Sequence, residues 1–448
     1  MSDRAPDVTV DAEPVTGADR ISSLDTLRGI ALCGILLMNI AGFGLPFAYS
    51  DPTNFGGDTG VNLLAWMTTT LFFEGTMRGL FTLLFGAGII LLTQRLEGKE
   101  FRLPVADIYY RRNLWLIAFG VIHGYLLLWV GEILYYYGLA ALFLYPFRKV
   151  RPLFLTILGI LCLASLVPKN LYFYQESVAG QTAAAQVALL EASGDAVDPE
   201  LKEKADGWAE HLKYKKPEDR LIQADIQGMT SGYVTAVAHV TPILTEFQSY
   251  DTYVWVFWDV IGFMLIGMAL LRWGVLGASR SSRFYLVMGA LGYAVGLPVN
   301  IYEIVHIMGS GFDALAFERA YLTYDVGRLG MTFGHLGLIL YAFKQNWIPR
   351  LMARMSAVGR MALTNYIGHT AICSTLFYGF GFYGQLQRWQ LYVLVFAIWA
   401  FQLWASPLWM KYFRFGPLEW LWRSLTYWQL QPLRRRPGDG MTPAPTGA

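Results

Sequence analysis

The 448-residue sequence has few charged residues and few cysteines, and it lacks the common motifs of soluble enzymes. Charged residues make up 15% of it, whereas soluble domains carry about a quarter, so it does not fit a single water-soluble globule. Cys33, Cys162 and Cys373 lie in separate apolar segments, which fits neither a disulfide framework nor a metal site. There is no Walker phosphate loop, no H-E-x-x-H zinc pair and no G-x-S-x-G elbow. With 35 basic and 33 acidic residues, the net charge of +2 gives no nucleic-acid footprint.

Hydrophobic residues make up 55% of the sequence and fall in long blocks. Blocks of roughly 17–25 apolar residues match a helix that crosses a bilayer. The sequence therefore predicts an all-α, polytopic membrane helix bundle of about ten transmembrane helices. The second block is too long for a perpendicular span, and Glu74-Gly75 in its middle predicts a tilt or a kink. The blocks are 29–48, 63–93, 113–130, 133–147, 153–168, 254–271, 284–308, 321–343, 361–380 and 390–410.

Lys and Arg alternate between the connections that join these blocks. The positive-inside rule assigns the short connections that are rich in them to the cytoplasm. The alternate short connections carry only Arg319 and Arg388. Both termini are therefore predicted to be cytoplasmic. The basic connections carry Arg95, Lys99, Arg102, Arg111 and Arg112, then Arg148, Lys149 and Arg151, then Arg272, Arg280 and Arg283, and last Lys344, Arg350, Arg354 and Arg360.

The chain divides into five predicted regions. The segment 169–252 is a polar insertion on the outer side, and its many strong helix formers predict a small helical cap or lid. The aromatic and basic stretch FRFGPLEWLWRSLTY predicts a helix in the inner interface. The regions are a disordered cytoplasmic tail at 1–20, a five-helix transmembrane core at 21–168, the insertion at 169–252, a five-helix bundle at 253–410, and an interfacial helix with a basic tail at 411–448.

Polar side chains within the apolar blocks are the candidate functional residues. Each costs a few kcal/mol in hydrocarbon, so such groups usually face a bundle interior or a wet cavity. Each also has a structural alternative, as a helix cap, an ion pair or a hydrogen bond between helices. Glu74 and Arg78 are four residues apart, which predicts an ion pair on one helix face. The candidates are Asp25, Arg28, Asn39, Glu74, Arg78, His123, Glu132, Glu303 and His306, with Asp325, Arg328, His335, Asn365 and His369 further along.

Short motifs are spread over most of the chain, namely residues 24–31 (LDTLRGIA) with 38–40 (MNI), 78–88 (RGLFTLLFGAG), 129–134 (WVGEIL), 359–366 (GRMALTNY) and 415–423 (FGPLEWLWR). Together they resemble the YeiB-type family of uncharacterised bacterial membrane proteins. The resemblance implies a multi-pass protein of the bacterial cytoplasmic (inner) membrane. Within the family pattern the acid that follows the His123 helix is usually Asp, and here it is Glu132.

The LDTLRG opening also resembles that of heparan-α-glucosaminide N-acetyltransferase, a membrane enzyme that passes acetyl from cytosolic acetyl-CoA to a sugar amine across the membrane. The resemblance implies a transmembrane acyltransferase core in which Asn39 matches the enzyme's active-site asparagine. The enzyme's catalytic histidine follows that asparagine shortly afterwards. Here the corresponding neighbourhood, residues 48–51 (AYSD), holds no histidine. Either His123 or another histidine replaces it, or the chemistry differs.

The expected function is acyl transfer from cytosolic acyl-CoA, most simply acetyl-CoA, to a hydroxyl or amine of an extracytoplasmic glycan or lipid. In this scheme Arg28, with Asp25, holds the coenzyme A phosphates. Asn39 donates to the developing oxyanion. His123 is the general base, with Glu132 either orienting it or binding the acceptor.

Glu74, Arg78, Glu303 and His306 are assigned to substrate binding, and no metal is expected. The expected partners are membrane lipid and a small-molecule or glycan acceptor, without nucleic acid, and a homo-dimer is left open. The main alternative is a transporter or flippase for a small organic or lipid-linked solute, in which the buried charged residues line a path and relay protons. A third interpretation is a structural or sensory membrane protein whose polar groups hold its helices together.

Overall fold

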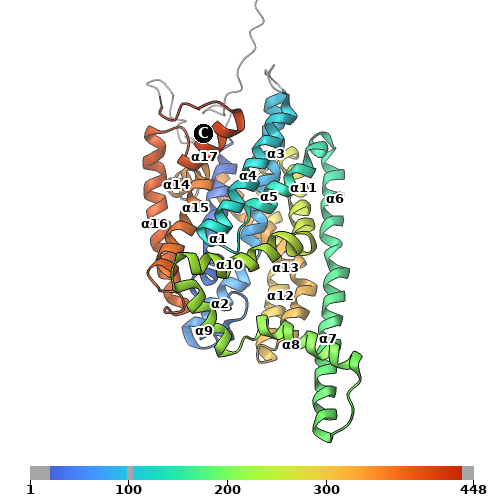
Figure 1. Ribbon diagram of the computed structural model, residues 1–448. Coiled ribbons are helices and arrows are strands. Elements are labelled where there is room, and N and C mark those ends of the chain that lie inside the picture. Colours follow the sequence, from blue (N-terminus) through green and yellow to red (C-terminus); the bar gives the residue numbers. More distant parts are fainter. Residues whose placement is uncertain (1–20, 98–103, 436–448) are drawn as a thin grey trace, which may run out of the picture.

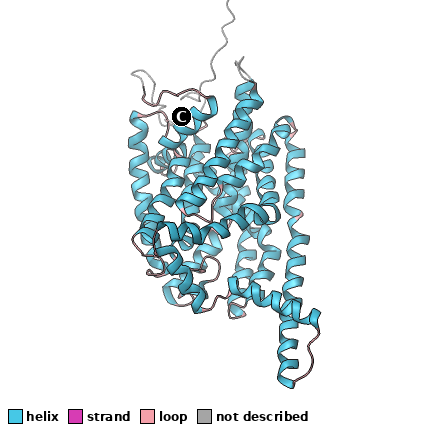
Figure 2. Cartoon of the chain, in the orientation of Figure 1, coloured by secondary structure: helices cyan, strands magenta, loops and turns pink. Residues whose placement is uncertain are grey.

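The computed structural model describes residues 21–97 and 104–435, and within these ranges every regular element is a helix (Figures 1 and 2). The only strand-like pairing there is an isolated bridge between Phe413 and Arg434. The α-helices are α1 Ser22–Gly44, α2 Gly60–Phe72, α3 Thr76–Glu97, α4 Val105–Leu127, α5 Leu134–Leu144, α6 Pro152–Ala164, α7 Leu166–Ser193, α8 Pro199–Lys215, α9 Asp219–Thr230, α10 Tyr233–Glu246, α11 Phe257–Arg272, α12 Ser282–Gly309, α13 Ala314–Lys344, α14 Pro349–Arg360, α15 Ala362–Ser374, α16 Arg388–Tyr412 and α17 Pro417–Tyr427. Shorter 3-10 helices (η2 Pro52–Phe55, η3 Tyr145–Lys149) and π-helices (η4 Phe247–Val256, η5 Thr375–Gly379) join them.

Seven helical segments within the described residues are long and apolar enough to cross a membrane. Three of the ten expected spans fall short of that standard. Helix α5 has only 11 residues and α15 only 13, while α4 carries Asp107, Arg111 and Arg112 near its start. The seven segments are Ser22–Gly44, Gly60–Glu97, Pro152–Ser193, Tyr233–Arg272, Ser282–Gly309, Ala314–Lys344 and Arg388–Tyr412.

The two ends of the described chain lie at the same end of the bundle, here called the α17 end. The Thr26 hydroxyl near the start of α1 donates to the Met352 carbonyl of α14 over 3.4 Å. Helix α14 leads directly into α15, whose first turn is held by α17, because the Glu419 carboxylate accepts from the Leu363 amide over 2.6 Å. The opposite end, where Figure 1 shows α8 and α9, is here called the α8 end.

The expected insertion consists of α7 to α10 at the α8 end. Its predicted limits, 169 and 252, fall inside continuous helices rather than in loops. Helix α7 follows α6 within the helical segment Pro152–Ser193, and α10 passes through the π-helix η4 into α11 within Tyr233–Arg272. Two membrane-spanning helices therefore extend directly into the insertion, which ties its position to the bundle.

Helix α17 packs against the bundle rather than only lying along the interface. The Trp422 indole donates to the Arg112 carbonyl over 2.8 Å, and the Arg112 guanidinium lies 3.6 Å above the Trp422 ring. Glu419 is 9% exposed and accepts from the first amides of α15. Burial raises the pKa of Glu419, although hydrogen bonds from Thr364 oppose that rise. The segment thus joins α4 and α15 at the α17 end.

The long second apolar block is broken between α2 and α3, where the sequence predicts a tilt or a kink. Helix α2 ends at Phe72 and α3 starts at Thr76. Gly75 has φ of +63°, a left-handed conformation that glycine adopts without steric cost. The break lets the chain present Phe73 and Glu74 in directions that one straight helix would not allow.

Helices α3 and α11 approach each other closely at two facing glycines. A Cβ atom on Gly86 would collide with the backbone of Met264, and one on Gly267 would collide with the backbone of Leu83. Backbone cannot move aside as a flexible side chain can, so these positions require glycine. Close approach at small residues is the usual way in which membrane helices gain packing contacts.

Gly86→Ala is therefore expected to lower the free energy of unfolding by about 1–3 kcal/mol through overpacking. Gly88 in the same helix provides the matched control, because a Cβ atom there would meet nothing within 4 Å. Gly88→Ala should leave stability unchanged or raise it by up to about 1 kcal/mol, since alanine favours the helix. Thermal unfolding of the two purified variants in the same detergent measures the difference. Equal melting temperatures would contradict the packing argument.

Candidate functional site

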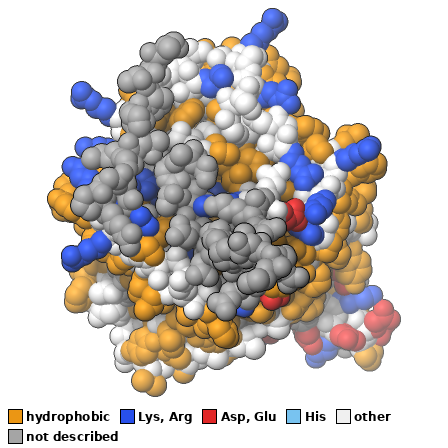
Figure 3. Space-filling model, turned by 90° about the horizontal axis from the view of Figure 1, so that it is seen from above, with side chains coloured by type: hydrophobic (Ala, Val, Ile, Leu, Met, Phe, Trp, Pro, Cys, Tyr) orange, Lys and Arg blue, Asp and Glu red, His pale blue; other side chains and the backbone are white. Residues whose placement is uncertain are grey.

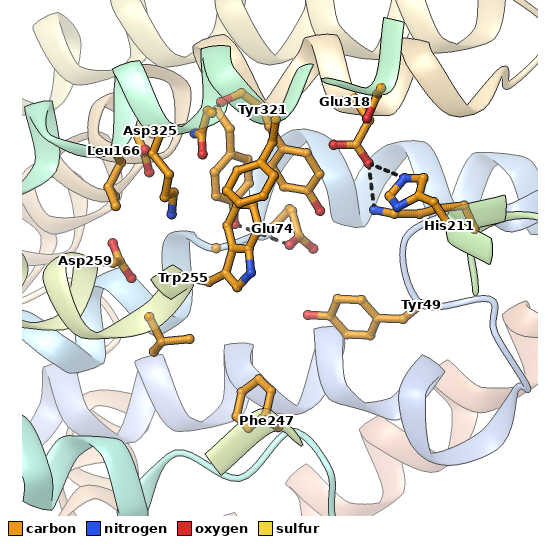
Figure 4. A pocket seen from close by; sticks show the side chains of 18 of the residues that line it. Tyr49, Glu74, Leu166, His211, Phe247, Trp255, Asp259, Glu318, Tyr321 and Asp325 are labelled. Atoms are coloured by element: carbon orange, nitrogen blue, oxygen red, sulfur yellow. Dashed lines mark hydrogen bonds and ion pairs between the residues drawn. The ribbon is translucent and has the colours of Figure 1, made fainter. Parts of the chain in front are cut away.

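A large cavity lies within the bundle (Figure 4). Exposed α8 residues in its lining place its opening at the α8 end. Its volume is about 1350 Å³, above the roughly 300–1,000 Å³ of common small-molecule sites. Residues of α1, α3, α5, α7, α8, η4, α11 and α13 and of the segments after α1, α2 and α4 form the wall. Exposed Glu200 and Lys204 of α8 lie at the mouth. Toward the α17 end, the described residues beyond the wall include Leu32, Leu80 and Phe263, each 1% exposed or less.

Four charged side chains form a network at the deep end of the cavity. Asp259 of α11 accepts from Arg78 of α3 over 2.9 Å and also from Arg328 of α13. Arg328 donates in addition to Asp325 over 2.7 Å. The side chains of Asp259 and Arg328 are only 7% and 2% exposed. One carboxylate thus connects two guanidinium groups from different helices, and the network ties α3, α11 and α13 together.

The predicted ion pair between Glu74 and Arg78 is wrong. Glu74 lies in the break between α2 and α3, so the two residues do not share a helix face. Arg78 pairs instead with Asp259, and Glu74 accepts a hydrogen bond from the Tyr324 hydroxyl over 3.4 Å. The pairing of Arg78 spans 181 residues, which no spacing rule within one helix could detect. Both Glu74 and Arg78 line the cavity.

Asn39 of α1 also lies on the cavity wall, between Met38 and Gly42. At 1.5 Å per residue it is roughly 25 Å along the helix axis from Ser22. Its side chain is half-buried, and no hydrogen bond from another described side chain holds its amide. A polar amide on a membrane-spanning helix that faces a cavity is available to a ligand.

His123 and Glu132 lie together, but neither is on the cavity wall. The His123 Nδ1 and Glu132 Oε1 atoms are 3.5 Å apart, with side chains 0% and 1% exposed. His123 Nε2 shares a hydrogen bond with the Thr370 hydroxyl over 2.7 Å. Glu132 accepts from the amides of Leu134 and Tyr135 and so caps the start of α5. The pair holds the turn after α4, whose residues Gly131 and Ile133 do reach the cavity.

The remaining predicted site residues lie away from this wall. Asp25 and Arg28 form an ion pair of 2.8 Å at the α17 end. Glu303 is 9% exposed and accepts from the Thr323 hydroxyl over 2.6 Å, and His306 stacks on Tyr302 with ring centroids 6.0 Å apart. The structure therefore groups Asn39, Glu74 and Arg78 at one cavity, together with the candidates Asp325 and Arg328, but not the other six residues that were assigned a role.

Three residues at the cavity mouth were not among the predicted site residues. Glu318 of α13 lies 3.3 Å from the His211 ring nitrogen and 3.0 Å from the Lys215 ammonium, both on α8 (Figure 4). Burial disfavours the charge of Lys215, but neighbouring Tyr321 and Glu318 hold its pKa above the usual value. No sequence pattern predicts contact between these residues, because α8 and α13 meet only in the folded chain. The group fixes α8 over the mouth.

Aromatic side chains cover much of the remaining wall, and they give the cavity an amphipathic character. Figure 4 shows Tyr49, Trp255, Tyr321 and Phe247 directed into the same space. The Lys169 ammonium lies 4.2 Å from the Trp255 ring centroid. Among the described residues no group of three or more His, Cys, Asp or Glu side chains could hold a metal ion. The wall thus presents aromatic faces together with five cationic side chains, seven carboxylates and two amides, those of Asn39 and Asn170.

These features define a helical, multi-pass membrane protein with an amphipathic internal cavity. The chain belongs to the YeiB-type family. It is 32% identical to the uncharacterized protein YeiB of Escherichia coli (strain K12) over 91% of its own length and 96% of that protein. It is 30% identical to the uncharacterized protein YxaH of Bacillus subtilis (strain 168), over 95% and 98% of the two chains. A family model described as a protein of unknown function (DUF418) matches residues 270–429. No solved structure matches the chain.

Proposed function

We propose that the α17 end faces the cytoplasm and that the chain crosses a bacterial inner membrane ten times. Lys and Arg side chains surround that end of the molecule (Figure 3), as the positive-inside rule requires of a cytoplasmic face. Because the described chain starts and ends there, the number of complete crossings is even, so the seven long segments need further crossings from among the short helices. Helices α4, α5 and α15 would supply these three. Lys99, Arg102 and the terminal tails fall outside the described residues.

Within this membrane topology, we propose that the protein is an acyltransferase that modifies a hydroxyl or amine of a lipid or glycan acceptor in the cavity. The observation that carries the proposal is the Asn39 amide on the cavity wall, in the position that resembles an acyltransferase asparagine. Acyl transfer develops negative charge on the carbonyl oxygen, and a fixed hydrogen-bond donor stabilises that charge. The volume of about 1350 Å³ leaves room for an acceptor larger than a simple metabolite.

The position of His123 bears on the choice of general base. A base must come within hydrogen-bond reach of the proton that it removes, and His123 is enclosed by Thr370 and Glu132 behind the wall. Glu74, by contrast, faces the cavity. We therefore propose Glu74 as the base that accepts the proton of the acceptor, and we assign His123 and Glu132 to positioning the turn after α4.

Sidedness provides the test of acyl transfer. The protein is reconstituted in one orientation in vesicles of bacterial lipid extract, with radiolabelled acetyl-CoA supplied only at the α17 end. The expected result is acetyl label in the lipid or glycan fraction together with free coenzyme A at the α17 end. Label that appears only when acetyl-CoA is supplied at the α8 end would contradict the proposed direction. No label from either side would contradict the enzyme proposal.

A transporter or flippase is the second candidate, and one observation favours it. The cavity opens at the α8 end, whereas tightly packed described residues such as Leu32 and Leu80 close it toward the α17 end. A transporter that works by alternating access has a state in which its binding site is open to one side of the membrane and closed to the other. Acetyl-CoA or coenzyme A should stabilise only an acyltransferase, by about 2.7 kcal/mol at 100 times the Kd, and should therefore raise its melting temperature. Solute uptake without such stabilisation would favour the transporter.

A further inference from the structure

A second hollow lies on the outside of the bundle, between α2 and α16. Its volume is about 450 Å³, and nearly all its lining is apolar, from Leu37, Val61, Leu64, Ala65, Tyr392, Phe396 and Trp399 among others. Two threonines also line it, but their hydroxyls are engaged within α2. Thr68 donates to the Leu64 carbonyl over 2.8 Å and Thr69 to the Ala65 carbonyl over 2.9 Å. The hollow therefore offers little hydrogen bonding to a polar ligand.

The hollow faces the hydrocarbon of the membrane. Both α2 and α16 belong to segments that are long and apolar enough to cross a bilayer. At its rim Leu64 is 62% exposed and Phe396 58% exposed, as lipid-facing side chains are. A hydrocarbon chain is the ligand that such a surface accommodates, because the chain needs no hydrogen bonds and the surrounding membrane already supplies it.

The hollow and the charged cavity share one wall. Phe73, the residue that follows α2, lines both spaces. On α1, Leu37 lines the hollow, while the next residues, Met38 and Asn39, line the cavity. The break after α2 makes a similar division, since Phe73 is followed at once by Glu74, which lies in the cavity. An apolar site open to lipid and a charged site inside the bundle are thus separated by single side chains.

We propose that the two spaces together bind one amphipathic lipid, with its hydrocarbon chain between α2 and α16 and its polar head in the cavity. Phe73 lies at the point where the molecule passes from one space to the other. Lys169 on the cavity wall offers its ammonium to a phosphate in the head group, and the aromatic faces match the carbon skeleton of the lipid. The inference rests on the proposed function in one respect: if the protein is an acyltransferase, the bound membrane lipid is the acyl acceptor.

Photolabelling tests the lipid site without any acyl donor. Two phosphatidylglycerol analogues are used in phosphatidylcholine vesicles, one with a diazirine in the acyl chain and one with a diazirine on the glycerol head. The chain probe is expected to label α2 and α16 around Ala65 and Phe396. The head probe is expected to label the cavity wall around Asn39 and Trp129. Excess unlabelled phosphatidylglycerol should reduce labelling by both probes.

Ala65→Phe fills the hollow, and Ala290→Phe is its matched control. Ala290 is exposed on α12, another segment able to cross the membrane, so it receives the same added ring on a lipid-facing surface elsewhere. Ala65→Phe should reduce labelling by the chain probe and by the head probe by several-fold together, because one molecule occupies both spaces. Ala290→Phe should change neither.

Loss of chain labelling alone, with head labelling unchanged, would overturn the proposal, because it would show two independent sites. Labelling of α2 and α16 no stronger than that of exposed α12 would also overturn it, since the hollow would then be ordinary lipid contact. Both outcomes are independent of acetyl-CoA. The lipid site can therefore fail while acyl transfer is observed, or be found in a protein that transfers no acyl group.

Discussion

Asp259→Asn is expected to lower the free energy of unfolding by about 3–5 kcal/mol, the usual cost of removing one partner from a buried ion pair. Asparagine has nearly the same shape but no charge, so Arg78 and Arg328 would lose the carboxylate that connects them. Because Arg328 is only 2% exposed, water cannot replace the lost interaction effectively. The result would be a large fall in melting temperature in detergent or vesicles.

Asp107→Asn is the matched control, because it makes the same chemical change at an exposed residue in the first turn of α4. It should cost less than about 1 kcal/mol, the limit for a charge near a helix end. The double variant Asp259→Asn/Arg328→Gln should be less destabilised than the sum of its single changes, since it removes the uncompensated cation as well. A single variant as stable as the wild type would contradict the structural role of the network.

Asn39→Ala is expected to reduce acyl transfer by about 10²–10³-fold, the cost of removing one oxyanion donor. Stability should stay within about 0.5 kcal/mol of the wild type, because no hydrogen bond from another described side chain depends on the Asn39 amide. Initial rates in oriented vesicles and melting temperatures of the same preparations measure the two effects.

Asn113→Ala gives the opposite pattern and serves as the control. Asn113 is 3% exposed in α4 and donates to the Tyr109 carbonyl over 2.9 Å. Its replacement should lower stability by about 1 kcal/mol and leave the rate of the folded protein unchanged. If Asn39→Ala kept the wild-type rate, the amide would have no part in catalysis. The resemblance at this position would then not indicate a shared catalytic role.

Much of the fold could be predicted because its causes are local. The length and apolarity of each block predict a membrane helix directly, and within the described residues the chain is helical throughout its regular elements. The pair Glu74-Gly75 predicted a tilt or kink, and the helix does break there. The short helices are harder to predict. The 11 residues of α5 are helical and buried because they pack against α4 and α11, which composition alone does not reveal.

The candidate site was predictable only in part, because pattern rules see neighbours within one helix. Among the candidates from the sequence, Asn39, Glu74, Arg78, Asp325 and Arg328 meet at the cavity. The sequence paired Glu74 with Arg78 because they are four residues apart, whereas Asp259, 181 residues away, is the actual partner of Arg78. Asp259 could have been singled out as an acid inside the apolar block 254–271, although nothing in the sequence identifies its two arginine partners.

Composition, hydropathy and motifs are enough to predict a strongly hydrophobic, all-helical protein of the YeiB type, with its basic residues in alternate connections. Those properties follow from side-chain hydrophobicity and charge, which act wherever the residue lies. Which polar groups lie together depends on how the helices pack. The packing places Asn39 on the cavity wall and encloses His123 with Glu132 behind that wall. The reason is physical: the contacts of a buried polar group depend on the rotation and spacing of whole helices, and these are set by packing at residues such as Gly86 and Gly267.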